Sequence, residues 1–492
     1  MVSQKEFFDC LVVGTGPSSE PVIFNLSKTN LKVLIIDAGN IFDTQGKSLK
    51  GKREKYYSSL TPKQKYKDFN TTYNNTLALS SLSKIKSRNF SYISCFLSGG
   101  LSNFWGGGIT EWGKEDILKT TSISPNEIRN SYAELKKRIK VINSTKVNEL
   151  SNISKQIINK NKKGKMINFK RAKILSNYKD HNFLQLDEKY SQDNLIWNSK
   201  ESIRKYINNS KNITYFKKYK AIKIDKNIDN WIITCETDNK ITKIYAKSIF
   251  LCAGCINSTI LSFTALREKE IELSFSHHLA GIFPIINLKK IPKLTNKFIS
   301  LPELSWSFKS KSNTVLASGY IYNWKLIFEN LEKIKFFRTK FLKSKIFPII
   351  NFISIYIDND KNKLFIKKIL DTNRKEKFIL SIFSKNNLLK DWFKLVKISF
   401  SINKFIPNYI LIINFFMILI RRGGDIHYGC TMPEFVNTKY PLRTNKNGEL
   451  LKLKNIYICD SSRLSSLSSQ AHTFTIMAIV NSSMKNILKN NH

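Results

Sequence analysis

The sequence lacks an apolar run long enough to cross a membrane. Its longest apolar stretch, YILIINFFMILI at residues 409–420, contains Asn414 and is preceded by Pro407. A bilayer-spanning helix needs about 20 apolar residues, so this stretch is too short. We predict a buried core element here. The alternative is a segment that lies in a membrane interface, with Arg421 and Arg422 at the lipid headgroups.

The sequence also lacks the marks of a secreted protein. Its seven cysteines are odd in number and scattered, and Lys5 and Glu6 interrupt the start where a secretory signal would have its apolar run. Cys252 and Cys255 have a redox-like spacing, but no further Cys or His lies near them at metal-ligand spacing. We therefore expect them to pack as small apolar side chains. A reducing, cytoplasmic location is predicted, with peripheral membrane attachment as the alternative.

Acidic residues are scarce: 37 Asp and Glu stand against 81 Lys and Arg, a net charge of +44. Such a charge would suit a nucleic-acid-binding protein. Lys, Ile and Asn are, however, abundant along the whole chain of 492 residues. This distribution favours a solvated lysine-rich surface, so nucleic acid is not the expected partner. Attraction to anionic membranes or acidic substrates remains open. The length itself predicts two or three domains.

The first forty residues contain the pattern of a dinucleotide-binding turn. An apolar run at 10–13 is followed by GTGPSS, a short helical stretch and a second apolar run that ends in Asp37. The glycines let backbone N–H groups approach a pyrophosphate at a helix N-terminus, and an acid at this distance binds a ribose hydroxyl. Ser19 stands where the fingerprint has its third glycine, and it is still small. The predicted cofactor contacts are Gly14, Gly16, Ser18, Ser19 and Asp37.

A second glycine-rich stretch, SGGLSNFWGGG, occupies residues 98–108. Its glycines let the backbone pass close to a flat ligand. A mobile surface loop is the alternative, but the two aromatic residues Phe104 and Trp105 argue against it. We predict that Gly99, Gly100 and Asn103 contact the cofactor.

Two of the six histidines lie in loop-like motifs near the end of the chain. His427 lies in GGDIHYGCTMP and His472 in SSQAHTFT. Oxidation of an alcohol requires removal of the hydroxyl proton as hydride leaves carbon, and a neutral imidazole suits that task. His427 and His472 are therefore the candidate catalytic residues, although two unrelated structural histidines are the alternative. No metal-ligand set is predicted.

The apolar residues after His472 recur at helical spacing, which predicts a buried helix that starts near Thr473. The positive end of that helix would stabilise an anionic reduced flavin. Upstream, the strand-like NIYICD ends in Asp460, which is placed to bind ribityl or phosphate-linked hydroxyls.

These motifs together resemble the glucose–methanol–choline oxidoreductase family, most closely its small bacterial members found among surface-polysaccharide genes. The resemblance rests on GTGPSS with Asp37, GGLSNFWGGG, SIFLCAGCINST, HYGCTMP and IYICDSSRLSS with AHTFTIMA, in the family's order. It implies bound FAD and oxidation of a CH–OH group of an alcohol or sugar, with hydride transfer to flavin N5. His427 matches the family's catalytic base, His472 its second His-or-Asn position, and Ala221 the strand residue whose backbone meets the adenine.

Two departures from the family pattern matter. His427 is followed by Tyr-Gly-Cys-Thr, one residue shorter than the usual His-x-x-Gly-Thr. Phe104 stands where some members carry a histidine bonded to FAD, so the resemblance implies a noncovalent flavin. The electron acceptor and the substrate are not indicated.

The predicted fold is α/β, with a Rossmann-like FAD-binding domain assembled from discontinuous segments. These segments are 1–115, 203–285 and 421–492, and residues 116–202 and 286–420 would form an α+β substrate or cap domain. Two other functions remain open at this stage. One is a flavoprotein reductase or isomerase that acts on a lipid at a membrane surface. The other is a non-catalytic basic homologue that binds membrane or nucleic acid.

Overall fold

The structure is a computed structural model. It describes residues 6–39, 85–88, 95–103, 105–143, 152–160, 166–177, 196–237, 240–266, 268, 270–287, 302–323, 350–358, 364–370, 376–382, 388–420, 423–435 and 440–490.

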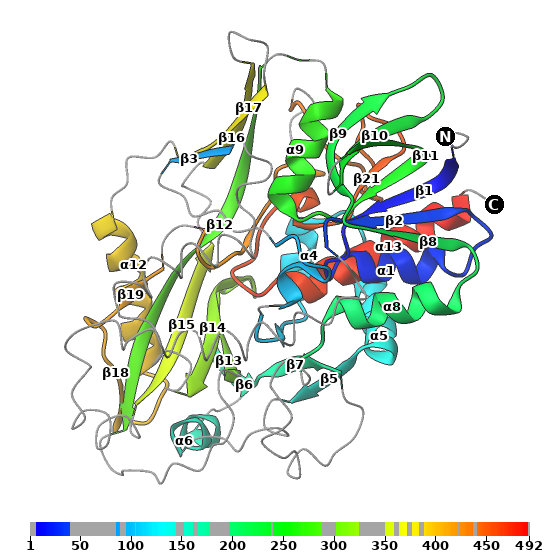
Figure 1. Ribbon diagram of the computed structural model, residues 1–492. Helices are drawn as coiled ribbons and strands as arrows, with labels where there is room; N and C mark the ends of the chain where they lie inside the picture. The colour runs from blue at the N-terminus through cyan, green and yellow to red at the C-terminus, as the bar shows by residue number, and fades with distance from the viewer. Residues whose placement is uncertain are drawn as a thin grey trace, which may run out of the picture.

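The described residues form two large β-sheets side by side (Figure 1). The first has seven strands in the order β8-β2-β1-β11-β10-β9, with β21 added beside β11. Its strands β1, β2, β8, β11 and β21 run parallel. The strands are β1 (Phe7–Val13), β2 (Val33–Asp37), β8 (Ile213–Lys217), β9 (Lys220–Lys226), β10 (Trp231–Glu236), β11 (Ile241–Leu251) and β21 (Ile456–Ile458).

Both faces of this first sheet are buried, which explains why its strands read as continuous apolar runs. On β1, Leu11 and Val13 face one apolar cluster and Cys10 and Val12 face the other. The helix α9 covers the first of these faces. On the second face, α13 packs against α1 and α5. The helices are α1 (Ser19–Leu26), α5 (Pro125–Arg138), α8 (Ser199–Asn209), α9 (Cys255–Ala265) and α13 (Thr473–Asn490).

The helix α5 follows a Ser-Pro pair, and its start has a local cause. The Ser124 hydroxyl accepts the Glu127 backbone N–H at 3.2 Å, and the Glu127 carboxylate accepts the Ser124 N–H at 3.1 Å. This reciprocal pair is a capping box, and Pro125 has a backbone angle that suits a first turn. The helix predicted near Thr473 is confirmed.

The second sheet has eleven strands and is largely antiparallel, in the order β3-β17-β16-β12-β15-β14-β13-β6, with β18, β19 and β20 also paired to β12. Its strands are β3 (Ile85–Arg88), β6 (Ile167–Arg171), β12 (Glu270–Asn287), β13 (Pro302–Lys309), β14 (Val315–Asn323), β15 (Ile350–Asp358), β16 (Leu364–Leu370), β17 (Glu376–Ile382), β18 (Ile410–Ile412), β19 (Ile418–Leu419) and β20 (Tyr428–Gly429).

Smaller elements complete the described fold. A three-stranded sheet consists of β4 (Gly108–Ile109), β5 (Lys140–Asn143) and β7 (Lys173–Ser176). The remaining helices are α4 (Lys114–Thr120), α6 (Asn152–Lys160) and α12 (Leu388–Asn403), with short 3₁₀ turns η1 (Gly100–Asn103) and η6 (Ser461–Arg463).

The first sheet is built from the three segments assigned to the cofactor domain, and α/β architecture is confirmed. Three strands of the second sheet fall within the segments assigned to the cofactor domain. They are β3 within 1–115, most of β12 within 203–285 and β20 within 421–492. The predicted boundary at residue 285 fails because β12 is one continuous strand from Glu270 to Asn287, which that boundary would cut.

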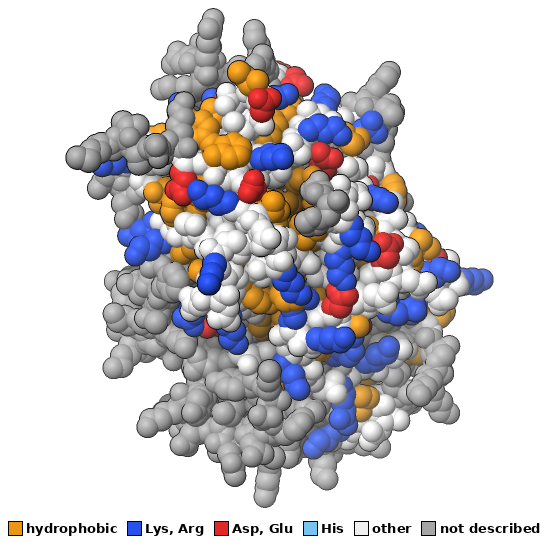
Figure 2. Space-filling view, turned by 90° about the vertical axis from the view of Figure 1, so that its right-hand side faces the viewer, with side chains coloured by type: hydrophobic (Ala, Val, Ile, Leu, Met, Phe, Trp, Pro, Cys, Tyr) orange, Lys and Arg blue, Asp and Glu red, His pale blue; other side chains and the backbone are white. Residues whose placement is uncertain are grey.

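Basic side chains are spread widely over the surface. Figure 2 shows Lys and Arg scattered over the described part of one face, with a few Asp and Glu between them. None of the described helices combines the length and the apolar character that crossing a membrane requires.

Candidate active site

The carboxyl ends of the parallel strands meet at one edge of the first sheet. Gly14 N donates to Ile36 O, Cys252 N to Val13 O, and Cys459 N to Leu251 O, each at 2.9 Å. The loops that follow β1, β11 and β21 are thereby held next to one another. Ligands of open parallel sheets bind at this edge.

The turn after β1 needs glycine for two different reasons. Gly14 has φ +95°, and a Cβ there would lie 2.8 Å from the Cys252 carbonyl oxygen, so packing of the protein itself excludes a side chain. At Gly16 a Cβ would meet Cys252 O at 3.7 Å, an ordinary contact. A Cβ added at Gly100, in the second glycine-rich stretch, would lie 3.3 Å from Gly16 Cα. The two glycine-rich loops therefore form one backbone cradle.

A cavity of about 410 Å³ lies against this cradle, between the two large sheets. Most of the predicted site residues line it, although they come from all three segments of the first domain. They are Gly14, Gly16, Ser18, Asp37, Gly100, Ala221, His427, Asp460, His472 and Thr473.

Three of the predicted cofactor-binding residues do not line the cavity but support the loops that do. The Ser19 hydroxyl donates to Gly16 O at 2.7 Å, at the start of α1. Gly99 N donates to Thr15 Oγ1 at 2.9 Å. The Asn103 amide donates to Ser98 O at 3.0 Å and to Gly100 O at 2.7 Å. Ser19, Gly99 and Asn103 therefore hold the glycine-rich loops in shape.

Asp37 lines the cavity but is already bonded to its own turn. Its carboxylate accepts Thr15 N at 2.8 Å and Thr15 Oγ1 at 2.5 Å through one oxygen, and Gly39 N at 2.7 Å through the other. Burial raises the pKa of Asp37, and these hydrogen bonds oppose the rise. The acid thus fixes the glycine turn, a role that the ribose assignment did not include.

Asp460 repeats this arrangement after β21. Its carboxylate accepts the hydroxyls of Ser258 and Ser462 and the Ser462 backbone N–H. Burial raises the pKa of Asp460, and the serine donors counteract part of that effect. Asp460 therefore connects the strand end to α9.

His427 is held by backbone contacts on both sides of its loop. β20, which follows it, pairs with Ser276 and His277 of β12, and His278 N donates to His427 O at 3.3 Å. On the other side the Ser461 hydroxyl donates to Tyr428 O at 2.8 Å. The His427 side chain is 25% exposed and faces the cavity, so its position is fixed while its ring is accessible.

His472 lies beside His427, with ring centroids 5.2 Å apart. It directly precedes α13, and Trp112 Nε1 donates to the neighbouring Ala471 O at 3.1 Å. Burial, and to a smaller degree the nearby His427, lowers the pKa of His472 to about 3. His472 is therefore neutral at ordinary pH and can act as a hydrogen-bonding partner.

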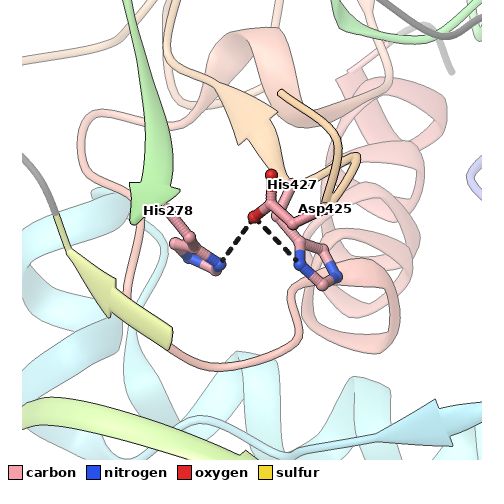
Figure 3. Close-up of side chains that lie close together, drawn as sticks. All are labelled: His278, Asp425 and His427. Atoms are coloured by element: carbon pink, nitrogen blue, oxygen red, sulfur yellow. Dashed lines mark ion pairs between the residues drawn. The ribbon is translucent and has the colours of Figure 1, made fainter. Parts of the chain in front are cut away.

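Sequence reasoning missed two members of this cluster, Asp425 and His278. Figure 3 shows the Asp425 carboxylate between the rings of His427 and His278, the latter from β12. Asp425 Oδ2 lies 3.5 Å from His427 Nδ1 and 3.7 Å from His278 Nδ1. The Asp425 side chain is 1% exposed, so its charge faces imidazole nitrogens and not water. The available signal was the His277-His278 pair in a chain with so few histidines.

His278 is fixed from its far side, because its Nε2 lies 2.7 Å from the carbonyl oxygen of Ser468. A carbonyl can only accept, so Nε2 carries the proton. Burial and the neighbouring histidines lower the pKa of His278 well below its usual value. The ligand atoms of His278, Asp425 and His427 lie within 4.8 Å of one another, a spacing that would also accommodate one metal ion.

The prediction that Phe104 replaces a flavin-bonded histidine lies outside the described residues. Its neighbour Trp105 is described: it lines the cavity, and its Nε1 donates to Trp197 O at 3.0 Å.

The buried histidines predict acid-sensitive stability. The pKa of His472 is about 3 in the folded protein, whereas a histidine in an unfolded chain has one near 6.5. Above pH 6.5 both forms are neutral; as pH falls below it, only the unfolded chain takes up the proton, and stability decreases. His472→Asn should flatten the dependence of Tm on pH between 7 and 5. A slope equal to that of the wild type would contradict this expectation.

The chain was compared with protein families, with curated sequences and with solved structures. No family model and no curated protein sequence matches the chain. The crystal structure of pyridoxine 4-oxidase from Mesorbium loti does match, with a TM-score of 0.65 and 11% identity, over 99% of this chain and 100% of the other. The likeness therefore spans both sheets. The chain has the fold of this glucose–methanol–choline oxidoreductase, which confirms at the level of fold the resemblance seen in the sequence.

Proposed function

We propose that this protein is an FAD-dependent oxidoreductase that oxidises a CH–OH group of an alcohol or sugar, with His427 as the base. One observation carries the proposal. His427 and His472, 45 positions apart in sequence, lie side by side in the wall of the cavity to which the Gly14–Ser18 turn also belongs. A cofactor cradle and a pair of imidazoles thus share one space.

The residues of the cradle fit FAD. Gly16 and Gly100 bring bare backbone to the cavity, and α1 begins directly after the turn. The first N–H groups of a helix have no partners within it and favour an anion such as a pyrophosphate. When bound, FAD would supply the hydride acceptor, and Thr473 at the start of α13 would lie at the positive end of that helix. Noncovalent binding is part of the proposal, on the basis of Phe104 in the sequence.

His427 is the better candidate for the base because it is the more exposed ring and has a carboxylate behind it. Asp425 Oδ2 faces His427 Nδ1, so a proton on Nδ1 leaves the lone pair of Nε2 for a substrate hydroxyl. His472 is neutral and buried, which suits a residue that holds the same hydroxyl by a hydrogen bond.

Aromatic side chains from the second sheet form the opposite wall of the cavity. Tyr320 and Tyr322 come from β14, and Tyr356 from β15 stands edge-on to His427, with ring centroids 5.4 Å apart. Flat apolar faces with hydroxyl groups suit a ring-shaped polyol or another cyclic alcohol. Pyridoxine 4-oxidase is by its name an oxidase, which supports oxidation chemistry on this fold.

A substitution at Gly16 separates cofactor binding from folding. A side chain at Gly16 has room within the protein but points toward the cavity, whereas one at Gly14 collides with Cys252 O. Gly16→Val should fold with nearly normal Tm and lose most of its flavin. Gly14→Ala, as the comparison, should lose stability.

Flavin content is measured from the absorbance of the supernatant after acid precipitation, which releases a noncovalent flavin. A full complement of FAD in Gly16→Val would disprove the assignment of this turn. Wild-type protein without any flavin, even after incubation with FAD, would favour a non-catalytic homologue.

The second test concerns the base. His427→Ala should slow anaerobic reduction of the flavin by about 10²–10⁴-fold, the usual contribution of base catalysis, with flavin content unchanged. His472→Ala should cost less, and His472→Asn least, since an amide can replace the hydrogen bond. Sugars, simple alcohols and lipids are offered in turn as reductants. Bleaching by lipids alone would favour the reductase or isomerase alternative, and equal rates for wild type and His427→Ala would refute the role of His427.

Asp425 is expected to be a positioning residue that acts through His427. Asp425→Asn removes the negative charge next to the base. It also replaces a group that can only accept by an amide that can donate as well, so the tautomer of His427 is no longer fixed and flavin reduction should slow by about 10²-fold or more. Asp391→Asn, which removes another buried acid on α12, serves as the control. Flavin reduction at the wild-type rate in Asp425→Asn would contradict a positioning role for Asp425.

A further inference from the structure

One face of α12 is apolar although it points into solvent. Leu389, Phe393 and Phe400 are spaced so that they share a side of the helix, and they are 69%, 61% and 46% exposed. The opposite side of the same helix is buried against the second sheet through Leu395 and Ile402. Large apolar side chains gathered on a surface mark an interaction site.

The connection between β18 and β19 extends this face. Phe415 and Phe416 are 69% and 70% exposed, whereas the polar residue before them, Asn414, is buried. The Ser399 hydroxyl of α12 donates to the Asn414 amide oxygen at 2.7 Å, and Phe416 N closes a turn onto Ile413 O at 3.2 Å. The buried Asn414 thus holds Phe415 and Phe416 outward. Folding alone would favour burial of the phenylalanines and exposure of the asparagine.

The helix and the connection form a single surface. The Phe415 ring lies 6.1 Å from that of Trp392 and 6.0 Å from that of Phe400. Both elements lie at the same edge of the second sheet, with β18 and β19 paired to β12 (Figure 1). We call the exposed residues Leu389, Phe393, Phe400, Phe415 and Phe416 the apolar edge.

Positive charge accompanies the apolar edge. Lys397 lies between Phe393 and Phe400 on the same side of α12, and Lys404 follows one turn later; both side chains are exposed. Between residues 388 and 420 the sequence has four lysines and one acid, Asp391. Asp391 is buried and lies 3.8 Å from Lys394, so the exposed charge of this segment is positive.

We propose that the apolar edge is a membrane-docking surface that inserts shallowly into a bilayer containing anionic lipid. A bilayer interface offers both things that this surface requires, an apolar layer for the phenylalanines and negative headgroups for the lysines. A second copy of the chain offers the same apolar edge but no negative charge, because a net charge of +44 would bring lysine against lysine. The proposal does not depend on the proposed chemistry, since it concerns a surface outside the cavity.

Co-sedimentation with lipid vesicles tests this directly. The purified full chain is mixed with vesicles of equal parts phosphatidylglycerol and phosphatidylcholine, and separately with phosphatidylcholine alone. Binding should be strong to the first and weak to the second. Phe415→Ser with Phe416→Ser should lower partitioning by about tenfold or more, since two buried rings are lost. Lys397→Gln and Lys404→Gln should each lower it about fivefold.

The matched control is Ile228→Ser, which removes an 88% exposed apolar side chain from the turn between β9 and β10. It should leave partitioning unchanged, and all variants should keep the Tm of the wild type. Equal vesicle binding by the phenylalanine double variant and the wild type would overturn the proposal. So would absence of vesicle binding together with self-association, measured by light scattering, that the same double variant abolishes.

Discussion

The parallel pairing of β1 and β21 with β11 is the constraint on which the site depends. β11 takes β1 on one side through Phe7–Val13 and β21 on the other through Ile456–Ile458, so segments more than 400 positions apart end at the same edge. Because parallel strands end at the same edge of a sheet, the Gly14 turn, the Cys252 loop and the Asp460 loop lie side by side there. A Cβ at Gly14 would strike Cys252 O, which shows how tightly this edge is packed.

The second sheet supplies His278 of the histidine cluster through the strand β12. β12 carries His278 near the cavity and pairs with β20, the short strand that directly follows His427. The Asp425 carboxylate is enclosed between those two imidazoles, where water cannot solvate it. A buried charge is tolerated only when nearby groups compensate it. The proton of His278 is on Nε2, so His427 Nδ1 is the nearby nitrogen that can turn an N–H toward Asp425. The pairing of β12 with β20 brings these groups together and so links both sheets to the proposed chemistry.

The sequence predicted what depends on local patterns. The Gly14–Ser19 turn, the helix beginning at Thr473 and the convergence of His427 and His472 follow from glycine spacing, apolar periodicity and family motifs. His278 and Asp425 could not be assigned, because their meeting depends on the pairing of β12 with β20, and no local pattern encodes a long-range strand pair. Asp37 and Asp460 were found as residues, but their hydrogen bonds to Thr15 and Ser258 depend on side-chain positions that only the fold defines.

The stretch at 409–420 shows why composition alone leaves burial open. The sequence predicts a buried core element here, with an interfacial segment as the alternative, and in the structure some of its residues are buried and others are exposed. Ile410 and Ile412 are buried on β18, whereas Leu411 between them is exposed, as the two-residue period of a strand requires. An unbroken apolar run hides that period, since both faces look alike in sequence. Apolar residues on the solvent face of a strand cost solubility and add nothing to the core. Their presence on both β18 and the adjoining turn is therefore better explained by a surface that meets an apolar phase than by the needs of folding.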